Sequence, residues 1–223
     1  MPNIMIATLK QSLMHLSLAE QAYHLLEGEL VTLRLPPGEL VSEKELMDAA
    51  QIGRTPVREA IQRLSAEGLL KVLPRKGLMV TALKRSDLTS IIEICRVLER
   101  LMVVKSTERA RPDQRRALEV LAIQFESVDN DFAMLFNLGY RLDELLDAAC
   151  HNQFLVKALS PMRSQCRRVW YLRRNELDLA YSAQLLAGLA RAVANQDVAG
   201  AIRAMNELIA ILEKLVTGLD VIS

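Results

Sequence analysis

The 223-residue sequence has few aromatic residues, no long apolar run and only three cysteines. Aromatic side chains make up 4% of a chain that is 51% hydrophobic, which favours helices packed on helices and argues against an all-β sandwich. Apolar runs such as 101–104 and 208–212 fall far short of the roughly 18 residues that cross a bilayer. The first residues show no export-signal pattern, and the scattered cysteines suit reduced thiols. We therefore expect a cytoplasmic protein that does not enter a membrane.

Charge is balanced overall but concentrated in one short segment. The formal net charge is +1, yet residues 51–85 hold eight basic and two acidic side chains, whereas residues 1–50 hold three basic and seven acidic ones. A basic block is often only a solvated face. Its meaning therefore depends on the elements that surround it.

Capping motifs and periodicity predict three helices in the first third of the chain. Ser17 with Glu20, and Ser42 with Glu45, form capping boxes that predict a helix after each serine. A third helix is predicted to start at Pro56 with Thr55 as its cap. Its inward stripe consists of Val57, Ala60, Ile61 and Leu64.

After Gly68 the period changes from helical to extended. Residues 69–73 and 78–81 predict a two-stranded hairpin with the basic tip Pro74-Arg75-Lys76-Gly77. Three short helices followed by a hairpin is the layout of a winged helix-turn-helix, whose third helix enters the major groove of DNA.

The start of the third helix suits a phosphate group. Its unpaired amides and positive dipole end attract anions, and Arg54 and Arg58 flank it with further donors. The alternative is that these arginines are a solvated helix start. Because the cap, the proline, the arginine pair and the basic hairpin occur together in the right order, we expect double-stranded DNA as the partner.

The segment 15–82 resembles the amino-terminal domain of the GntR family of bacterial transcription regulators. The resemblance is carried by Pro37-Gly38-Glu39, Ser42-Glu43-Lys44-Glu45-Leu46, Arg54-Thr55-Pro56-Val57-Arg58-Glu59-Ala60, Glu67-Gly68-Leu69 and Lys76-Gly77. It implies a phosphate contact for Lys44 and groove contacts for Arg54, Thr55 and Arg58. It also implies a contact between the wing and DNA through Lys76 and Gly77. We add the neighbouring Arg75 to this predicted contact. Gly53 stands where the family usually has a serine, and so lacks a side chain that could cap the helix or bind phosphate.

The helical period returns at residue 86 and persists. Helices are predicted over 86–110, 112–127, 131–150, 152–174, 177–195 and 197–217. Ser160-Pro161 should either kink the fourth of these or begin a new helix. The expected protein is thus mostly α-helical, with a small β-hairpin in its first part and an all-helical bundle in its second.

The second part resembles the effector-binding and dimerisation domain of the FadR subfamily, the FCD type. The carriers are Arg96-Val97-Leu98-Glu99, Asn152-Gln153-Phe154-Leu155, and the closing Ala192-Val193, Asp197, Ala201 and Met205. The resemblance implies a homodimer and a small-molecule effector. It divides the chain into a winged helix-turn-helix domain over 1–82 and an effector-binding and dimerisation domain over 83–223.

Many members of that subgroup look like metal binders, with an aspartate and three histidines inside the bundle. At the matching positions this chain has Gly139, Asp143, Leu186 and Leu208. Three of these four cannot bind a metal, and the chain has only three histidines, which are scattered. We therefore expect neither a metal nor another cofactor.

The bundle could instead hold a small organic effector. Leu186 and Leu208 would make the pocket apolar and leave Arg96 and Asp143 as the groups that orient the ligand, with an acid paired to Arg96 as one candidate. Alternatively, Arg96 and Glu99 form a structural ion pair beside a collapsed cavity.

A row of arginines on the helix predicted over 152–174 has two readings. Arg163, Arg167, Tyr171 and Arg174 share one face of that helix. The row could bind an anion or support the DNA-binding domains, although a solvated or subunit-facing surface is the commoner explanation.

The sequence thus predicts a dimeric transcription regulator, most often a repressor in the family it resembles. Its affinity for a short inverted repeat would respond to the effector. The alternatives are an effector-independent regulator, a protein-interaction adaptor that has lost DNA, or an enzyme. For an enzyme no nucleophile with a base and an orienting group can be assembled.

Overall fold

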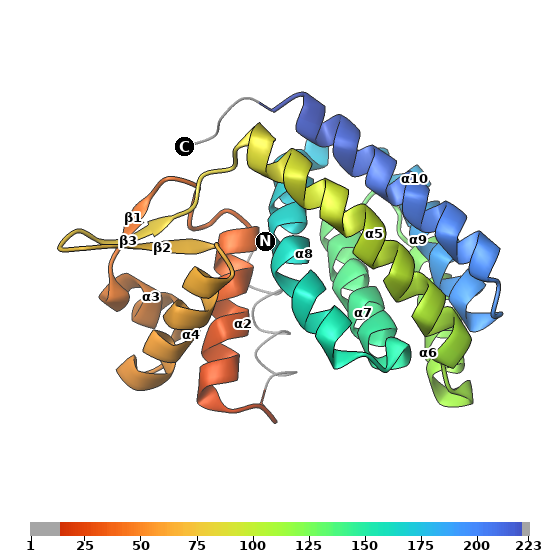
Figure 1. Cartoon of the computed structure of the whole chain (residues 1–223), viewed down its shortest axis with the longest axis horizontal. Coiled ribbons are helices and arrows are strands. Elements are labelled where there is room, and N and C mark those ends of the chain that lie inside the picture. Colours follow the sequence, from red (N-terminus) through yellow and green to blue (C-terminus); the bar gives the residue numbers. More distant parts are fainter. Residues whose placement is uncertain (1–13, 220–223) are drawn as a thin grey trace. The chain divides into compact units, whose positions relative to one another are not determined.

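The computed structural model describes residues 14–219. The helices are α2 (Leu18–Val31), α3 (Glu43–Ala50), α4 (Arg54–Ala66), α5 (Arg85–Arg109), α6 (Pro112–Glu126), α7 (Phe132–Cys150), α8 (Gln153–Leu172), η1 (Arg174–Glu176), α9 (Leu179–Ala194) and α10 (Val198–Thr217) (Figure 1). The strands are β1 (Leu40–Val41), β2 (Leu70–Leu73) and β3 (Gly77–Val80). The mostly α-helical fold with a small antiparallel sheet is as predicted.

The chain forms two compact units. Among the described residues, the first comprises 14–88, 164–172 and Leu219, and the second comprises 89–163 and 173–218. These units are not continuous in sequence, because the end of α8 packs with the first one. The functional division at residue 82 stays a prediction.

In the first unit, α2, α3 and α4 pack around an apolar core under the sheet. Leu26, Leu46 and Leu64, one from each helix, are completely buried there. Burying three such side chains contributes roughly 1.5–3 kcal/mol each, which holds the short helix α3 in place although it would not be stable alone.

The sheet has three strands in the order β1-β3-β2, not the two that the sequence predicts. Strand β1 pairs with β3 antiparallel, with Leu40 opposite Met79. The amide of Gly38 donates to Val80 O and the amide of Val80 donates to Glu39 O, each at 2.9 Å. A strand of two residues has no periodicity to detect, so only these backbone bonds reveal it.

Both predicted capping boxes are present, but the third helix starts earlier than predicted. Its N-cap is Gly53, at φ −68° and ψ 170° and without a side-chain bond. Thr55 and Pro56 lie within the first turn, so the predictions of a Thr55 cap and a start at Pro56 are wrong. The amides of the first turn have no partner inside the helix, which is why proline is tolerated there.

Residues 164–172, the end of α8, contribute polar contacts to the first unit. The hydroxyl of Ser164 donates to Glu27 Oε1 at 2.7 Å. Arg168 is fully buried and donates from Nη2 to Thr81 O at 2.6 Å. No carboxylate among residues 14–219 pairs with Arg168, and burial lowers the pKa of its guanidinium to about 10.

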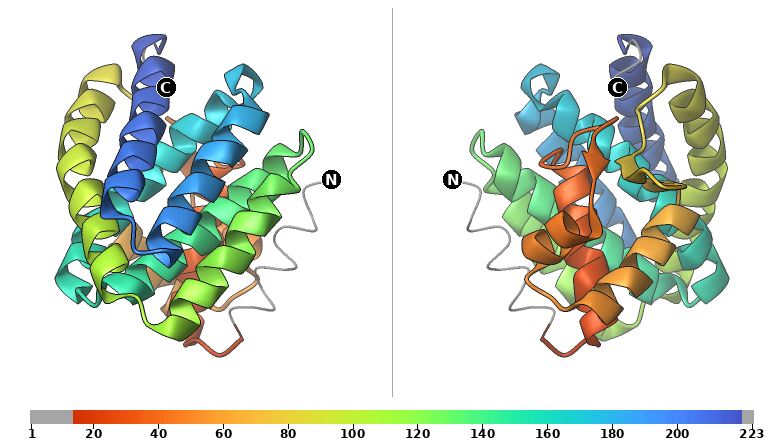
Figure 2. Two further views of the ribbon diagram at one scale, coloured as in Figure 1. Left: turned by 90° about the vertical axis from the view of Figure 1, so that its right-hand side faces the viewer. Right: turned by 90° about the vertical axis from the view of Figure 1, so that its left-hand side faces the viewer.

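The second unit is the predicted helical bundle. Helices α6, α9 and α10 lie side by side, with α9 between the other two (Figure 2). Predicted and observed helix bounds agree within a few residues, and α8 runs through Pro161 as one helix. In the part of the chain that the structure describes, no helix is long and apolar enough to cross a membrane.

Candidate nucleic-acid interface

The exposed start of α4 carries two arginines that share one carboxylate. Arg54 donates from Nε to Glu43 Oε2 at 3.2 Å, and Arg58 donates from Nε to Glu43 Oε1 at 2.7 Å. The side chains of Arg54 and Arg58 are 66% and 55% exposed. The hydrogen bond from Arg58, followed by that from Arg54, lowers the pKa of Glu43.

The first amides of α4 are uncapped. Gly53 has no side chain to accept their hydrogen bonds, and Thr55 is exposed beside them. The helix dipole adds a positive partial charge at this end. An uncapped helix start between two arginines is a place where a phosphate oxygen or a base edge can bind.

The turn between β2 and β3 is exposed and basic. Arg75 and Gly77 have positive φ values of 61° and 95°. A Cβ on Gly77 would lie 3.3 Å from Val41 O, so glycine suits this position both for its φ and for its closeness to β1. The tight turn presents Lys76 at the tip of the hairpin, where it is exposed.

All seven residues predicted to contact DNA lie on the surface of the first unit. Lys44 is on α3, three residues are in the first two turns of α4, and three form the hairpin turn. The seven are Lys44, Arg54, Thr55, Arg58, Arg75, Lys76 and Gly77. Their contacts with DNA stay a prediction. Sequence reasoning missed the contacts of Glu43, whose only signal is an acidic side chain within a basic motif.

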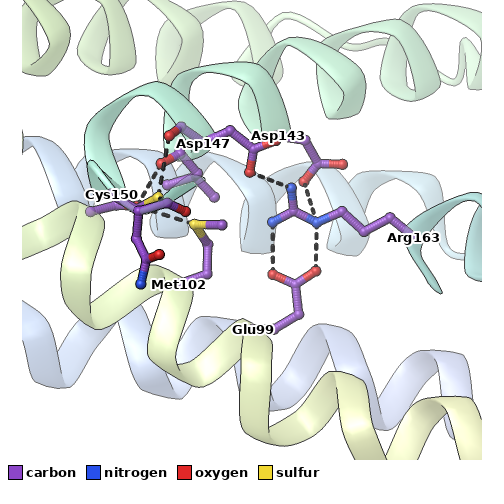
Figure 3. Close-up of polar contacts among 9 residues, drawn as sticks. Glu99, Met102, Asp143, Asp147, Cys150 and Arg163 are labelled. Carbon is purple, nitrogen blue, oxygen red and sulfur yellow. Dashed lines mark hydrogen bonds and ion pairs between the residues drawn. The ribbon is translucent and has the colours of Figure 1, made fainter. Parts of the chain in front are cut away.

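Inside the second unit, one guanidinium is enclosed by three carboxylates (Figure 3). Arg163 on α8 is 6% exposed and donates from Nε and Nη2 to the two oxygens of Glu99 on α5, at 2.7 and 2.9 Å. From α7, Asp147 accepts from Nη1 at 2.7 Å, and Asp143 lies 3.6 Å from Nε. Burial opposes the charge of Arg163, but these three carboxylates raise its pKa overall. Burial also raises the pKa of Asp147.

The structure does not bring the predicted effector residues together. Asp143 faces Arg163, whereas Arg96 lies on the exposed surface of α5 and pairs with Glu213 of α10. Leu208 is buried on α10 and Leu186 is partly buried on α9. The effector role of Arg96, Asp143, Leu186 and Leu208 stays a prediction.

Of two alternatives weighed from the sequence, the Arg96–Glu99 ion pair is wrong, and the solvated arginine row is wrong for Arg163 although Arg174 is exposed. Glu99 pairs with Arg163 and not with Arg96, because Glu99 is buried while Arg96 is exposed. Arg163 itself is buried rather than solvated, and Arg167 lies 3.6 Å from the buried Glu27. Spacing within α8 could not show this, because the partner carboxylates come from distant segments.

The residues at the family's metal positions do not fit a divalent ion. Gly139 and the two leucines offer no ligand atom, and the carboxylate of Asp143 faces a guanidinium that would repel a cation. Across residues 14–219, no group of three or more His, Cys, Asp or Glu side chains is placed to hold a metal. That the protein binds no metal stays a prediction.

A groove of about 400 Å³ lies between α9 and α10. Its polar lining includes Arg191, Asp197, Arg203 and Glu207. Arg191 is bound by Glu119 and Glu126, and Glu207 accepts from Tyr181. The charged groups of this groove are thus largely satisfied by their neighbours.

Comparison with known proteins finds matches for both parts of the chain. Residues 18–80 match the gntR family of bacterial regulatory proteins, and residues 90–210 match the FCD domain. An uncharacterized HTH-type transcriptional regulator of Agrobacterium vitis is 38% identical over 78 residues, 35% of this chain and 46% of the relative. The HTH-type regulator YdhC of Bacillus subtilis is 29% identical over 145 residues, 62% of this chain and 63% of the relative.

The chain thus spans about half to two thirds of the length of these relatives. Among solved structures, Escherichia coli McbR/YncC is similar with a TM-score of 0.77 and 20% identity, covering 91% of this chain and 98% of that one. At this identity the similarity shows the fold alone. Because both parts match in order, the chain belongs to the gntR family of bacterial regulatory proteins, with an FCD domain after its winged helix-turn-helix.

Proposed function

We propose that this chain is a transcription regulator, acting as a repressor, that binds a short inverted repeat in double-stranded DNA as a homodimer. The observation that carries the proposal is the exposed, uncapped start of α4 with Arg54 and Arg58 on either side. Donors at this place can reach phosphate and base edges together. Membership of a family of regulatory proteins favours this function over catalysis.

Dimerisation follows from the small number of contacts that one winged domain can make. A single module reads only a few bases, whereas two copies on a two-fold axis read both halves of an inverted repeat. The closed symmetry also requires that the same surface meet itself.

The surface that we propose for the dimer contact lies on α5. Ile94, Val97 and Leu101 follow at helical spacing and are 49%, 66% and 40% exposed. A large exposed apolar stripe of this kind marks an interaction site. Glu93 and Arg100, both exposed, are seven residues apart and therefore flank the stripe on the same side.

The positions of Glu93 and Arg100 indicate which partner packs on the stripe and in which orientation. An antiparallel second copy, related by a two-fold axis near residue 97, sets Glu93 of each copy beside Arg100 of the other. In a parallel copy, Glu93 and Arg100 of the two helices would lie on opposite sides of the stripe and would not meet. The pattern therefore fits a second α5 in antiparallel orientation, with the apolar side chains between the helices.

For regulation, we propose that a small organic effector binds the helical domain and changes operator affinity. A coupling of about 1–3 kcal/mol would change it roughly 5- to 150-fold. The interior argues against an acid at this place, because three carboxylates already surround Arg163. One observation favours a regulator that works without an effector. The ion pairs of Arg163 occupy part of the bundle interior, where an effector would otherwise bind.

The proposal is tested by selecting duplexes from a random DNA library with the full-length protein and titrating the enriched duplex in gel-shift assays. Arg58→Ala should abolish binding to that duplex. Arg203→Ala, which alters a 70% exposed side chain of the second unit, should bind normally. Failure to enrich any duplex would favour a protein-interaction adaptor that does not bind DNA. Normal binding by Arg58→Ala would refute the proposed contact between α4 and DNA.

A further inference from the structure

Glu43 is the acidic residue at the centre of the basic surface, and we propose that it is a positioning residue for sequence-specific DNA recognition. It holds Arg54 and Arg58 through their Nε atoms and leaves the terminal amino groups of both guanidiniums available to DNA. The inference rests on the proposed function, since it requires that α4 face the duplex.

The hydrogen-bonding pattern supports this role. A guanidinium has five N–H donors, and Glu43 uses only the single Nε donor of each arginine. Within residues 14–219, neither Arg54 nor Arg58 has another hydrogen-bond or ion-pair partner. Two terminal amino groups therefore remain on each arginine, and such a pair of donors matches the O6 and N7 acceptors of guanine.

The position of Glu43 is itself fixed. It is the first residue of α3, directly after Ser42, whose backbone amide donates to Glu45 Oε2 at 2.7 Å in the capping box. The carboxylate thus extends from a rigid helix start between α3 and α4. An arginine held before binding loses less conformational freedom when it meets a base than one that moves freely in solvent.

The negative charge of Glu43 adds discrimination. Non-specific binding depends on the attraction between basic side chains and phosphates, and a carboxylate in this surface weakens that attraction on every sequence. On the operator, the ordered arginines offset the loss through contacts that only the correct bases provide. Glu43 should therefore increase the ratio of operator affinity to non-specific affinity.

A plain alternative is that Glu43 only stabilises the positive end of the α3 dipole and repels phosphate. A matched variant separates the two, because Glu59 is an exposed carboxylate on α4 with no ion pair among the described residues. Glu59→Gln removes the same charge from the same surface without releasing either arginine.

The experiment measures dissociation constants of the full-length protein by fluorescence anisotropy. The probes are the duplex enriched by the wild-type protein and a scrambled duplex of equal composition, each at several salt concentrations. Glu43→Gln should bind the scrambled duplex at least as tightly as wild type, while its ratio of enriched to scrambled affinity falls about tenfold. Glu59→Gln should strengthen binding to both duplexes and leave the ratio unchanged.

Circular dichroism melting of each variant shows that the fold is kept. A ratio for Glu43→Gln within twofold of that for Glu59→Gln would overturn the inference, because the carboxylate would then act by charge alone. Arg58→Ala distinguishes failure of the inference about Glu43 from failure of the proposed function. If that variant keeps the wild-type ratio, α4 does not face the DNA at all.

Discussion

The guanidinium of Arg163 and the carboxylate of Glu99 form a two-bond ion pair inside the helical unit, with Nε–Oε1 and Nη2–Oε2 distances of 2.7 and 2.9 Å (Figure 3). Asp143 and Asp147 approach the same guanidinium from α7. The pair therefore joins α5 and α8, and through the two aspartates also α7. Removing one partner of such a buried network leaves charges without compensation.

Arg163→Met should lower the free energy of unfolding by about 3–5 kcal/mol, because it leaves the buried Glu99 and the partly buried Asp143 and Asp147 without a cation. Equilibrium urea denaturation followed by circular dichroism measures this. Arg203→Met, at an exposed arginine, should change the value by less than about 0.5 kcal/mol. A loss below about 1 kcal/mol for Arg163→Met would show that the network contributes little.

The loss in free energy of unfolding caused by Arg163→Met should also depend on pH. Burial already raises the pKa of Asp147 in the presence of Arg163, and loss of the guanidinium should raise it further. A carboxyl whose pKa is higher in the folded state binds its proton more tightly there, so stability falls as pH rises through that pKa. The difference between wild type and variant should therefore be larger at pH 7 than at pH 4, and a constant difference would contradict this.

Lys76→Ala should weaken binding to all DNA sequences by a similar factor, because an exposed lysine at the hairpin tip contacts phosphate rather than bases. Anisotropy titrations should show that the slope of log affinity against log salt decreases in magnitude by about 0.9 per lysine, or about 1.8 for the homodimer. Lys157→Ala, at an exposed lysine of α8, is the control. A loss confined to the operator would place Lys76 on a base edge instead.

Charge reversal tests the dimer surface on α5. Glu93→Arg alone and Arg100→Glu alone should each set like charges together and weaken the dimer about tenfold or more. The double reversal restores opposite charges in the antiparallel arrangement and should recover the dimer. Light scattering after size exclusion, over a dilution series, measures this, and a double variant as weak as the single ones would exclude the antiparallel contact.

The purified protein should contain well under one equivalent of any first-row metal, and a chelator should leave its melting temperature unchanged. The residues at the family's ligand positions offer one carboxylate and no imidazole. Elemental analysis with and without added zinc, nickel or manganese measures this. Near one equivalent per chain that survives dialysis would refute the prediction.

The elements that the sequence predicts best are those whose signals are local. Ser42 with Glu45 forms its capping box within four residues, and the structure shows both of its bonds. Helix α4 begins two residues before the predicted start, which the sequence places there because Thr55 has a good capping side chain while Gly53 has none. The backbone of Gly53 already adopts the extended conformation that the cap requires, and this is visible only in three dimensions.

The sequence by itself determined the order of helices and hairpin, the basic surface and the family, because capping, periodicity and turn residues act over a few positions. Only the tertiary structure decided which charges meet. Glu43 contacts arginines 11 and 15 residues away, and Arg163 contacts Glu99 across 64 residues. Contacts at such separations depend on how helices pack, and helix packing is set by the whole core rather than by any short segment.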